Sequence, residues 1–167
     1  EVMVDRGTGG SGAFGPAKQF GGVLIVSSDG KASFETDQPF ELLPGQSISW
    51  GSMPGTPDLP ADKNIIGQSY RLDAYPAALV ESGTVHIQYE GADSLLQAAD
   101  AGGATAGNVS IYFWDGNSWQ AVNTTISTPN NSADGVKLAS APSQGVGVYA
   151  VLEDASTGIV YLPLIQR

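Results

Sequence analysis

Apolar residues recur at every second position in several short windows of this chain. The clearest window is GTVHIQYE (83–90), in which valine, isoleucine and tyrosine alternate with threonine, histidine and glutamine. A period of two is the pattern of a β-strand that buries one face and exposes the other. The window IIGQSYRLDAYP (65–76) alternates less regularly and also predicts a strand.

Turn-forming residues divide the chain into short strands. Asp29-Gly30 lies inside GGVLIVSSDGKASFET (21–36) and predicts a hairpin with a two-residue turn, because both residue types tolerate positive φ. Pro44-Gly45, a type II turn signature, predicts a second strand pair in PFELLPGQSISWGS (39–52). Three prolines predict a long loop over 53–64, since proline lacks the amide that a central strand donates.

The remaining apolar windows bring the expected number of strands to roughly ten. They are NVSIYFW (108–114), WQAVNTTIST (119–128), GVKLASA (135–141), GVGVYAVLED (145–154) and GIVYLPLIQR (158–167). Residues 91–107 have the composition of a short helical connector. Many short strands with almost no helix predict an all-β fold, an antiparallel β-sandwich of the immunoglobulin-like kind. We assign residues 20–167 to one domain and the Gly-rich residues 1–19 to a flexible tail or linker.

Four aromatic residues surround an Asp-Gly pair in IYFWDGNSW (111–119). If residues 115–118 form a hairpin loop, Trp114 faces Trp119 across the strands and Tyr112 faces the alanine at 121. The opposite face then carries Val109, Ile111, Phe113 and Val122, with Gln120 near the turn. That set is mainly apolar, so we assign it to the core and place Tyr112, Trp114 and Trp119 on the outer face.

The outer residues Tyr112, Trp114 and Trp119 admit three interpretations. Cross-strand aromatic pairs stabilise a hairpin by about 0.2–1 kcal/mol, which is a purely structural role. Indole rings also stack on the C–H faces of sugars, which would make these residues a carbohydrate-binding platform. A contact patch for another protein is the third interpretation.

The charge of the chain excludes several partners. Seventeen acidic and seven basic residues give a net charge of −10, and the basic residues are scattered. No basic patch is available to neutralise phosphates, so nucleic-acid binding is not expected, and an anionic membrane would repel the chain. No apolar run approaches the roughly 20 residues of a membrane span, so we expect no membrane insertion. An acidic, Gly-rich composition with few charged residues favours a secreted or cell-surface location.

Residue types and motifs provide no candidate for catalysis. The chain has no cysteine, which excludes disulfides, thiolate zinc sites and a cysteine nucleophile. His86 is the single histidine, and no serine lies in the G-x-S-x-G motif of hydrolases. Acidic pairs occur at Glu35 and Asp37, Glu153 and Asp154, and Asp58 and Asp62. We interpret them as solvated turn residues and expect no catalytic residue, metal or cofactor, with calcium binding by the 53–64 loop as the alternative.

Residues 65–154 resemble GAIN-like β-sandwich modules of bacterial surface and secreted proteins. The resemblance is carried by Gly67, Tyr70 and Leu72, by Tyr89-Glu90, and by the hairpin residues Tyr112, Phe113, Trp114, Asp115, Gly116 and Trp119; Thr128, Asn130, Asn131 and 148–152 match more loosely. It implies a sandwich fold in a bacterial, extracellular setting. Some members of that group cleave their own backbone at a His-Phe-Ser sequence. The matching segment 142–150 lacks this sequence, so self-cleavage is not expected.

These observations predict a non-catalytic extracellular module with a structural, assembly or adhesive role. Exposed edge strands would join neighbouring copies into a surface filament or array, because unpaired amides and carbonyls template a further strand. We expect Val2, Met3 and Val4 to supply that strand. The expected partners are further copies of the chain, other surface proteins and glycans. The alternative function is a carbohydrate-binding module that uses Tyr112, Trp114 and Trp119.

Overall fold

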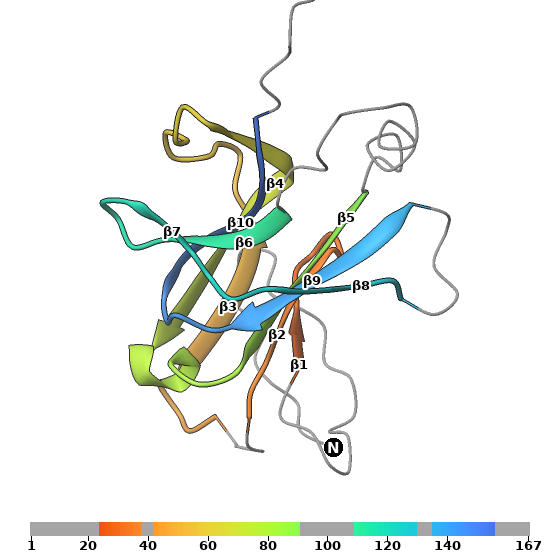
Figure 1. Ribbon diagram of the computed structural model, residues 1–167. Coiled ribbons are helices and arrows are strands. Elements are labelled where there is room, and N and C mark those ends of the chain that lie inside the picture. Colours follow the sequence, from red (N-terminus) through yellow and green to blue (C-terminus); the bar gives the residue numbers. More distant parts are fainter. Residues whose placement is uncertain (1–23, 38–41, 91–108, 130–134, 156–167) are drawn as a thin grey trace, which may run out of the picture.

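Two antiparallel sheets packed face to face form the protein. The computed structural model describes residues 24–37, 42–90, 109–129 and 135–155, and it places five strands in each sheet (Figure 1). The predicted all-β antiparallel sandwich is confirmed. The expected tail (1–19), helical connector (91–107) and last strand (158–167) lie outside the described residues.

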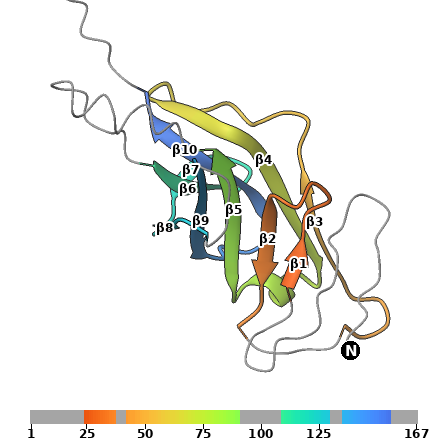
Figure 2. The ribbon, with the colours of Figure 1, turned by 90° about the vertical axis from the view of Figure 1, so that its right-hand side faces the viewer.

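The first sheet has the strand order β1-β2-β5-β9-β8, and Figure 2 looks onto it. Its strands are β1 (Leu24–Val26), β2 (Ala32–Glu35), β5 (Thr84–Glu90), β9 (Val136–Pro142) and β8 (Thr125–Ser127). The second sheet has the order β3-β4-β10-β6-β7. Its strands are β3 (Ser47–Ser52), β4 (Lys63–Tyr75), β10 (Gly147–Asp154), β6 (Val109–Trp114) and β7 (Trp119–Ala121). One short 3₁₀ helix that the sequence pattern did not predict, η1 (Ala77–Val80), follows β4.

The β1–β2 hairpin forms as predicted, with Ile25 opposite Phe34, but its turn is longer than two residues. The Ser27 amide donates to the Ala32 carbonyl at 2.8 Å, so the loop comprises residues 28–31. The Ser27 hydroxyl also accepts a hydrogen bond from the Ala32 amide at 2.9 Å, and Gly30 has φ of 72°. The Ser27 side chain therefore supplies a hydrogen-bond acceptor for a backbone amide at the end of the longer loop. The Asp-Gly pair alone does not reveal this loop length.

The turn at Pro44-Gly45 is present, but the structure describes only one strand of the predicted pair. Gly45 has φ of 85°, and the Gln46 amide donates to the Leu43 carbonyl at 2.9 Å. β3 follows this turn, whereas residues 38–41 lie outside the described residues. The predicted loop over 53–64 is also present and ends where β4 begins at Lys63.

The predicted single strand over 119–128 is wrong, because the segment divides into β7 and β8 in different sheets. The Val122 amide still donates to the Ile111 carbonyl at 2.9 Å, which continues the β6–β7 pairing. The Thr124 hydroxyl then accepts from the Ile111 amide at 2.8 Å and donates to the Val122 carbonyl at 2.7 Å. The Thr124 hydroxyl thus takes the place of a backbone carbonyl as the acceptor for the Ile111 amide. The pairing with β6 ends here, and the chain crosses to the other sheet.

The core lies between the sheets and is centred on large rings. Trp50, Phe34, Tyr70 and Tyr149 are all essentially inaccessible to solvent. β4 contributes to this core through an irregularity, because Tyr149 pairs with Tyr70 whereas Val151 pairs with Ile66. The extra residues of β4 include Gly67, with φ of 80°, and they leave Gln68 exposed. The bulge thus interrupts the alternation of the 65–76 window, although the Gln68 and Tyr70 side chains both still reach Asp29.

Tyr149 closes the corner at which the chain crosses from β9 to β10. Its hydroxyl donates to the Gly145 carbonyl at 2.7 Å and accepts from the Gln144 amide at 2.9 Å. The Ser143 hydroxyl donates to the Val80 carbonyl at 2.6 Å and accepts from the Gly145 amide at 3.2 Å. A tyrosine that bonds the backbone a few residues upstream is the tyrosine corner of Greek-key sandwiches. Burial raises the pKa of Tyr149 even though these hydrogen bonds oppose the shift.

Asp29 joins the two sheets. Its Oδ2 accepts hydrogen bonds from Tyr70 at 2.9 Å and from Gln68 at 2.7 Å, both on β4. Its Oδ1 accepts from the Ser27 hydroxyl at 2.5 Å and from the Lys31 amide at 3.1 Å. Burial opposes ionisation of this carboxyl, but the hydrogen bonds outweigh burial and lower the pKa of Asp29 from its usual 3.8. Burial and the neighbouring carboxylate raise the pKa of Tyr70 to about 12.

Acid is expected to remove the contribution of Asp29 to stability. Its folded-state pKa is lower than its unfolded-state pKa, so the carboxylate stabilises the fold above about pH 4 and this effect is lost as pH falls through the folded-state pKa. The difference in free energy of unfolding between wild type and Asp29→Asn, measured with urea, should be largest near pH 6 and shrink towards pH 2. Asp58→Asn controls for the loss of a surface charge. A difference for Asp29→Asn that stays constant over this range would contradict the expectation.

Candidate functional site

The aromatic hairpin pairs as the sequence predicts. Tyr112 lies opposite Ala121, and Trp114 lies opposite Trp119. On the core side, Ile111, Phe113 and Val122 are buried and Val109 packs against the core, whereas Gln120 is exposed. Tyr112, Trp114 and Trp119 are half-buried and lie on the outer face of the second sheet. The structure therefore brings the three predicted ligand-binding residues together on one face.

This outer face contains a second apolar layer that the sequence analysis missed. Val148, Ala150 and Leu152 point away from the core on β10, yet they are 4%, 0% and 0% exposed. Val148 pairs with Trp114, and Ala150 pairs with Tyr112. The sequence does contain a pattern that predicts this layer: residues 148–152 are all apolar, and an unbroken apolar run is typical of a central strand that is covered on both faces.

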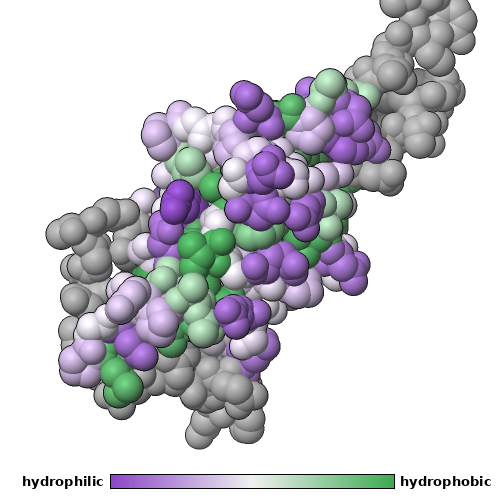
Figure 3. Space-filling view, turned by 90° about the vertical axis from the view of Figure 1, so that its left-hand side faces the viewer, coloured by the Kyte–Doolittle hydropathy of each residue, from purple (hydrophilic) through white to green (hydrophobic). Residues whose placement is uncertain are grey.

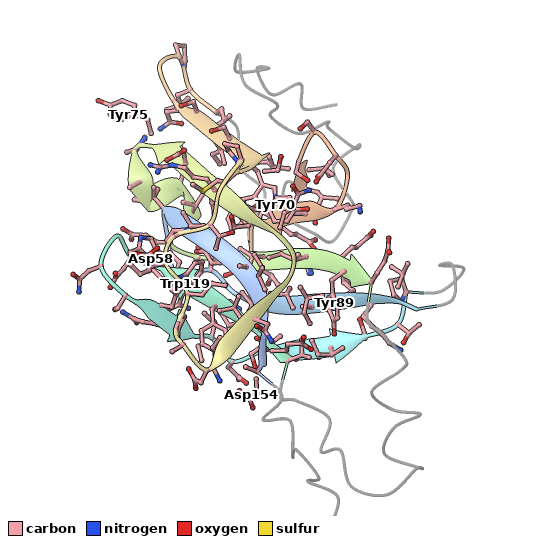
Figure 4. All side chains as sticks on the ribbon, turned by 90° about the horizontal axis from the view of Figure 1, so that it is seen from above. Asp58, Tyr70, Tyr75, Tyr89, Trp119 and Asp154 are labelled. Carbon is pink, nitrogen blue, oxygen red and sulfur yellow. The ribbon has the colours of Figure 1, made fainter. Side chains whose placement is uncertain are left out.

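Residues 53–62, which we call the covering loop, cross this face. The Met53 amide donates to the Ser69 carbonyl of β4 at 2.9 Å, and the Trp119 indole N–H donates to the Asp58 carbonyl at 3.1 Å. At the far end, the Ala155 amide donates to the Asp62 carbonyl at 2.8 Å. Figure 4 shows Asp58 beside Trp119. The loop is thus fixed to β4, to β7 and to the end of β10. It covers the outer face of β10, which lies between β4 and β6 in the sheet.

The three aromatic rings are occupied by contacts within the protein. Trp114 and Trp119 lie 5.6 Å apart between ring centroids, with 52° between their planes, so they do not form one flat surface. Trp119 also holds the covering loop through its indole N–H. The ammonium group of Lys63 lies 5.7 Å from the centre of the Tyr112 ring. In Figure 3, which faces this side, the hydrophobic areas are interrupted by hydrophilic residues.

Lys63 fastens the end of the covering loop to β10. Its Nζ donates to Asp154 Oδ1 and lies 3.7 Å from Asp62 Oδ2. The hydrogen bond to Asp154 and the contact with Tyr112 raise the pKa of Lys63, so its amine is held in the charged form. A charged amine is a poor nucleophile, and the cluster acts as an ionic clasp.

His86 is the residue whose surroundings most resemble a catalytic arrangement. Its Nδ1 lies 2.8 Å from the Ser140 hydroxyl, and its Nε2 lies 3.7 Å from Glu35 Oε2. An acyl-transfer site also needs donors aimed at the oxyanion. Ser140 lies in the middle of β9, which pairs with β5 on one side and β8 on the other, so the sheet ladder takes up the surrounding amides. We interpret the contacts of His86 with Glu35 and Ser140 as cross-strand contacts between β2, β5 and β9 on the outer face of the first sheet.

Of the acidic residues singled out in the sequence, Asp62 and Asp154 meet at the ammonium group of Lys63. Within residues 24–37, 42–90, 109–129 and 135–155, no group of three or more histidine, aspartate or glutamate side chains lies close enough to hold a metal ion. Over the same residues, no helix is both long and apolar enough to cross a lipid bilayer. Val2, Met3 and Val4, the predicted assembly strand, lie outside the described residues.

Comparisons of the chain with protein-family models, with curated proteins and with solved structures gave no match. The resemblance to GAIN-like modules therefore stays a prediction that its motifs alone carry.

Proposed function

We propose that this chain is a non-catalytic structural module of the cell surface or secreted space, and that it assembles with neighbouring copies through β-strand contacts. The observation that carries the proposal is the use of its polar side chains. Asp29 joins the two sheets, Tyr149 closes a corner, and Lys63 fastens the covering loop to β10. These polar side chains bind other parts of the same protein, which is what a rigid structural module requires.

The edge strands supply a means of assembly. β1 and β8 end the first sheet, and β3 and β7 end the second. β8 is the most accessible of these edges, because all three of its residues are exposed and β9 is its one partner among the described strands. An incoming strand such as Val2–Val4 of another copy would continue the ladder there.

Deletion of residues 1–12 tests this proposal. The full chain is expected to form polymers whose light scattering rises with protein concentration, and the shortened chain is expected to stay monomeric with an unchanged circular dichroism spectrum. Restoring polymers by adding a peptide with the sequence of residues 1–12 is not expected, because a free peptide caps an edge without linking two copies. A full chain that stays monomeric at millimolar concentration would remove the assembly function.

Carbohydrate binding is the weaker candidate. Tyr112, Trp114 and Trp119 share one face, which favours it, but a flat sugar ring needs an open ring face on which to stack. The tilt of 52° between the two indoles and the bond from Trp119 to the covering loop work against such a platform. These contacts suit the structural role of the hairpin better.

A further inference from the structure

Two large apolar side chains project into solvent at one end of the second sheet. Within the described residues, Leu43 is 61% exposed and Tyr75 is 71% exposed. Leu43 lies in the turn that leads into β3, and Tyr75 ends β4 opposite Ser47, the first residue of β3. Both therefore lie at the same end of the β3–β4 pair. Figure 4 shows Tyr75 directed away from the body of the protein.

The short helix η1 enlarges this apolar surface. Val80 is fully buried and Leu79 packs against the core, so these two side chains anchor the helix. The residues that remain exposed beside Leu43 and Tyr75 are apolar or small: Pro44, Pro76, Ala77 and Ala78. We call segments 42–46 and 74–80 together the apolar end.

The apolar end carries no charge on a strongly acidic protein. Neither 42–46 nor 74–80 contains a charged residue, although the chain has a net charge of −10. The nearest described charges are the exposed Glu81, which directly follows η1, and the pair of Arg71 and Asp73 on β4, which lie 2.8 Å apart and offset each other. Exposed apolar residues gathered in one place mark an interaction site more often than residues scattered singly.

We propose that the apolar end is the surface through which two copies of this chain associate, end to end. Two bodies with a net charge of −10 repel each other most weakly where both surfaces are uncharged and the acidic parts stay far apart. An identical end on the second copy meets this condition, and a twofold contact brings like residues together. A lipid surface fits less well, because the apolar end lacks the lysine and arginine residues that hold a protein at headgroups.

The contact is small and therefore weak when it acts alone. A stable interface buries about 800 Å² on each partner, which is more than a few exposed side chains supply. Its value lies in the assembly proposed above, on which this inference rests. Copies that are already joined by strand exchange meet at high effective concentration, where a weak second contact orders the array.

Charge introduced at the apolar end tests the contact. In sedimentation equilibrium, the double variant Leu43→Glu/Tyr75→Glu should associate at least about tenfold more weakly than wild type, because two apolar contacts are lost and like charges oppose each other. Gln88→Glu, which adds one negative charge on the exposed face of the first sheet, should associate like wild type, whereas Leu43→Glu alone, with the same added charge, should associate more weakly. Circular dichroism and thermal unfolding identify a variant that fails to fold. Leu43→Ser/Tyr75→Ser then repeats the measurement without added charge.

A cysteine placed at the apolar end tests the geometry directly, since the chain contains no cysteine of its own. Ala78→Cys is expected to form disulfide-linked dimers under mild oxidation, whereas Gln88→Cys is expected to stay monomeric. Equal cross-linking of both variants, or association of the glutamate double variant as strong as that of wild type, would overturn the proposal. So would binding to phosphatidylcholine vesicles that depends on Leu43 and Tyr75 in a protein that does not self-associate.

The two assembly contacts fail in distinguishable ways. Polymers that vanish on deletion of residues 1–12 but form as strongly in the glutamate double variant as in wild type overturn the apolar-end contact and leave the strand contact intact. Pairs that persist after the deletion and vanish in the double variant support the apolar end and remove the strand contact.

Discussion

Replacing Trp50 with alanine should lower the free energy of unfolding by about 3–5 kcal/mol, the largest loss expected for a single side chain here. Trp50 is fully buried between the sheets. Its ring stacks on Tyr70, with 6.0 Å between centroids and 14° between planes, and Tyr149 lies at 5.6 Å in a tilted arrangement. Alanine would leave a cavity bounded by rings that are themselves tied by hydrogen bonds. Urea denaturation at pH 7 measures the loss.

Trp114→Ala is the matched control, because it removes the same side chain from the outer face. Trp114 is half-buried against Trp119, so we expect a loss of no more than about 1.5 kcal/mol. Trp50→Phe should cost less than Trp50→Ala, since the indole N–H of Trp50 has no hydrogen-bond partner among the described residues and its removal is no penalty. A loss below about 1 kcal/mol for Trp50→Ala would show that the ring is not the centre of the core.

Tyr149→Phe should lower the free energy of unfolding by about 1–3 kcal/mol, although only one oxygen is removed. The Gly145 carbonyl would lose its donor and the Gln144 amide its acceptor at a corner where Gly145 is buried. The ring itself would stay in place beside Phe113, at 5.0 Å between centroids. The loss would therefore report on the hydroxyl alone, and urea denaturation again provides the measurement.

Tyr75→Phe controls for the loss of a tyrosine hydroxyl from the surface, because Tyr75 is 71% exposed, and it is expected to change stability by less than about 0.5 kcal/mol. Ser143→Ala extends the test, because Ser143 belongs to the same corner. The double variant with Tyr149→Phe should lose less than the sum of the single losses, since the two hydroxyls share the Gly145 backbone. Strictly additive losses would mean that the corner is not one network.

The local pattern of the sequence was enough to predict β5 and the β6–β7 hairpin and the faces of their residues. Alternation in 84–90 placed the residues of β5 correctly, because a strand with one covered face reveals its orientation in every second residue. The pairing of Trp114 with Trp119 followed from the Asp-Gly loop in the same way. Both predictions depend on residues that are close together in the chain.

The features that sequence failed to predict depend on distant residues or on single side chains. The crossing at Thr124 is decided by one hydroxyl that takes the place of a backbone group. The bulge at Gly67 shifts β4 against β10, a strand far along the chain. The covering loop was predicted as a loop, but its contact with Trp119 is visible only once β4, β10, β6 and β7 stand side by side.

The strand order also governs how this protein reaches its fold. The central pair of the second sheet joins Lys63 to Asp154, and that of the first sheet joins Thr84 to Pro142, so each sheet closes only after a late segment has emerged. Non-local pairing of this kind slows folding to milliseconds or seconds. Neither sheet can therefore complete its central pair until most of the described chain is available for pairing.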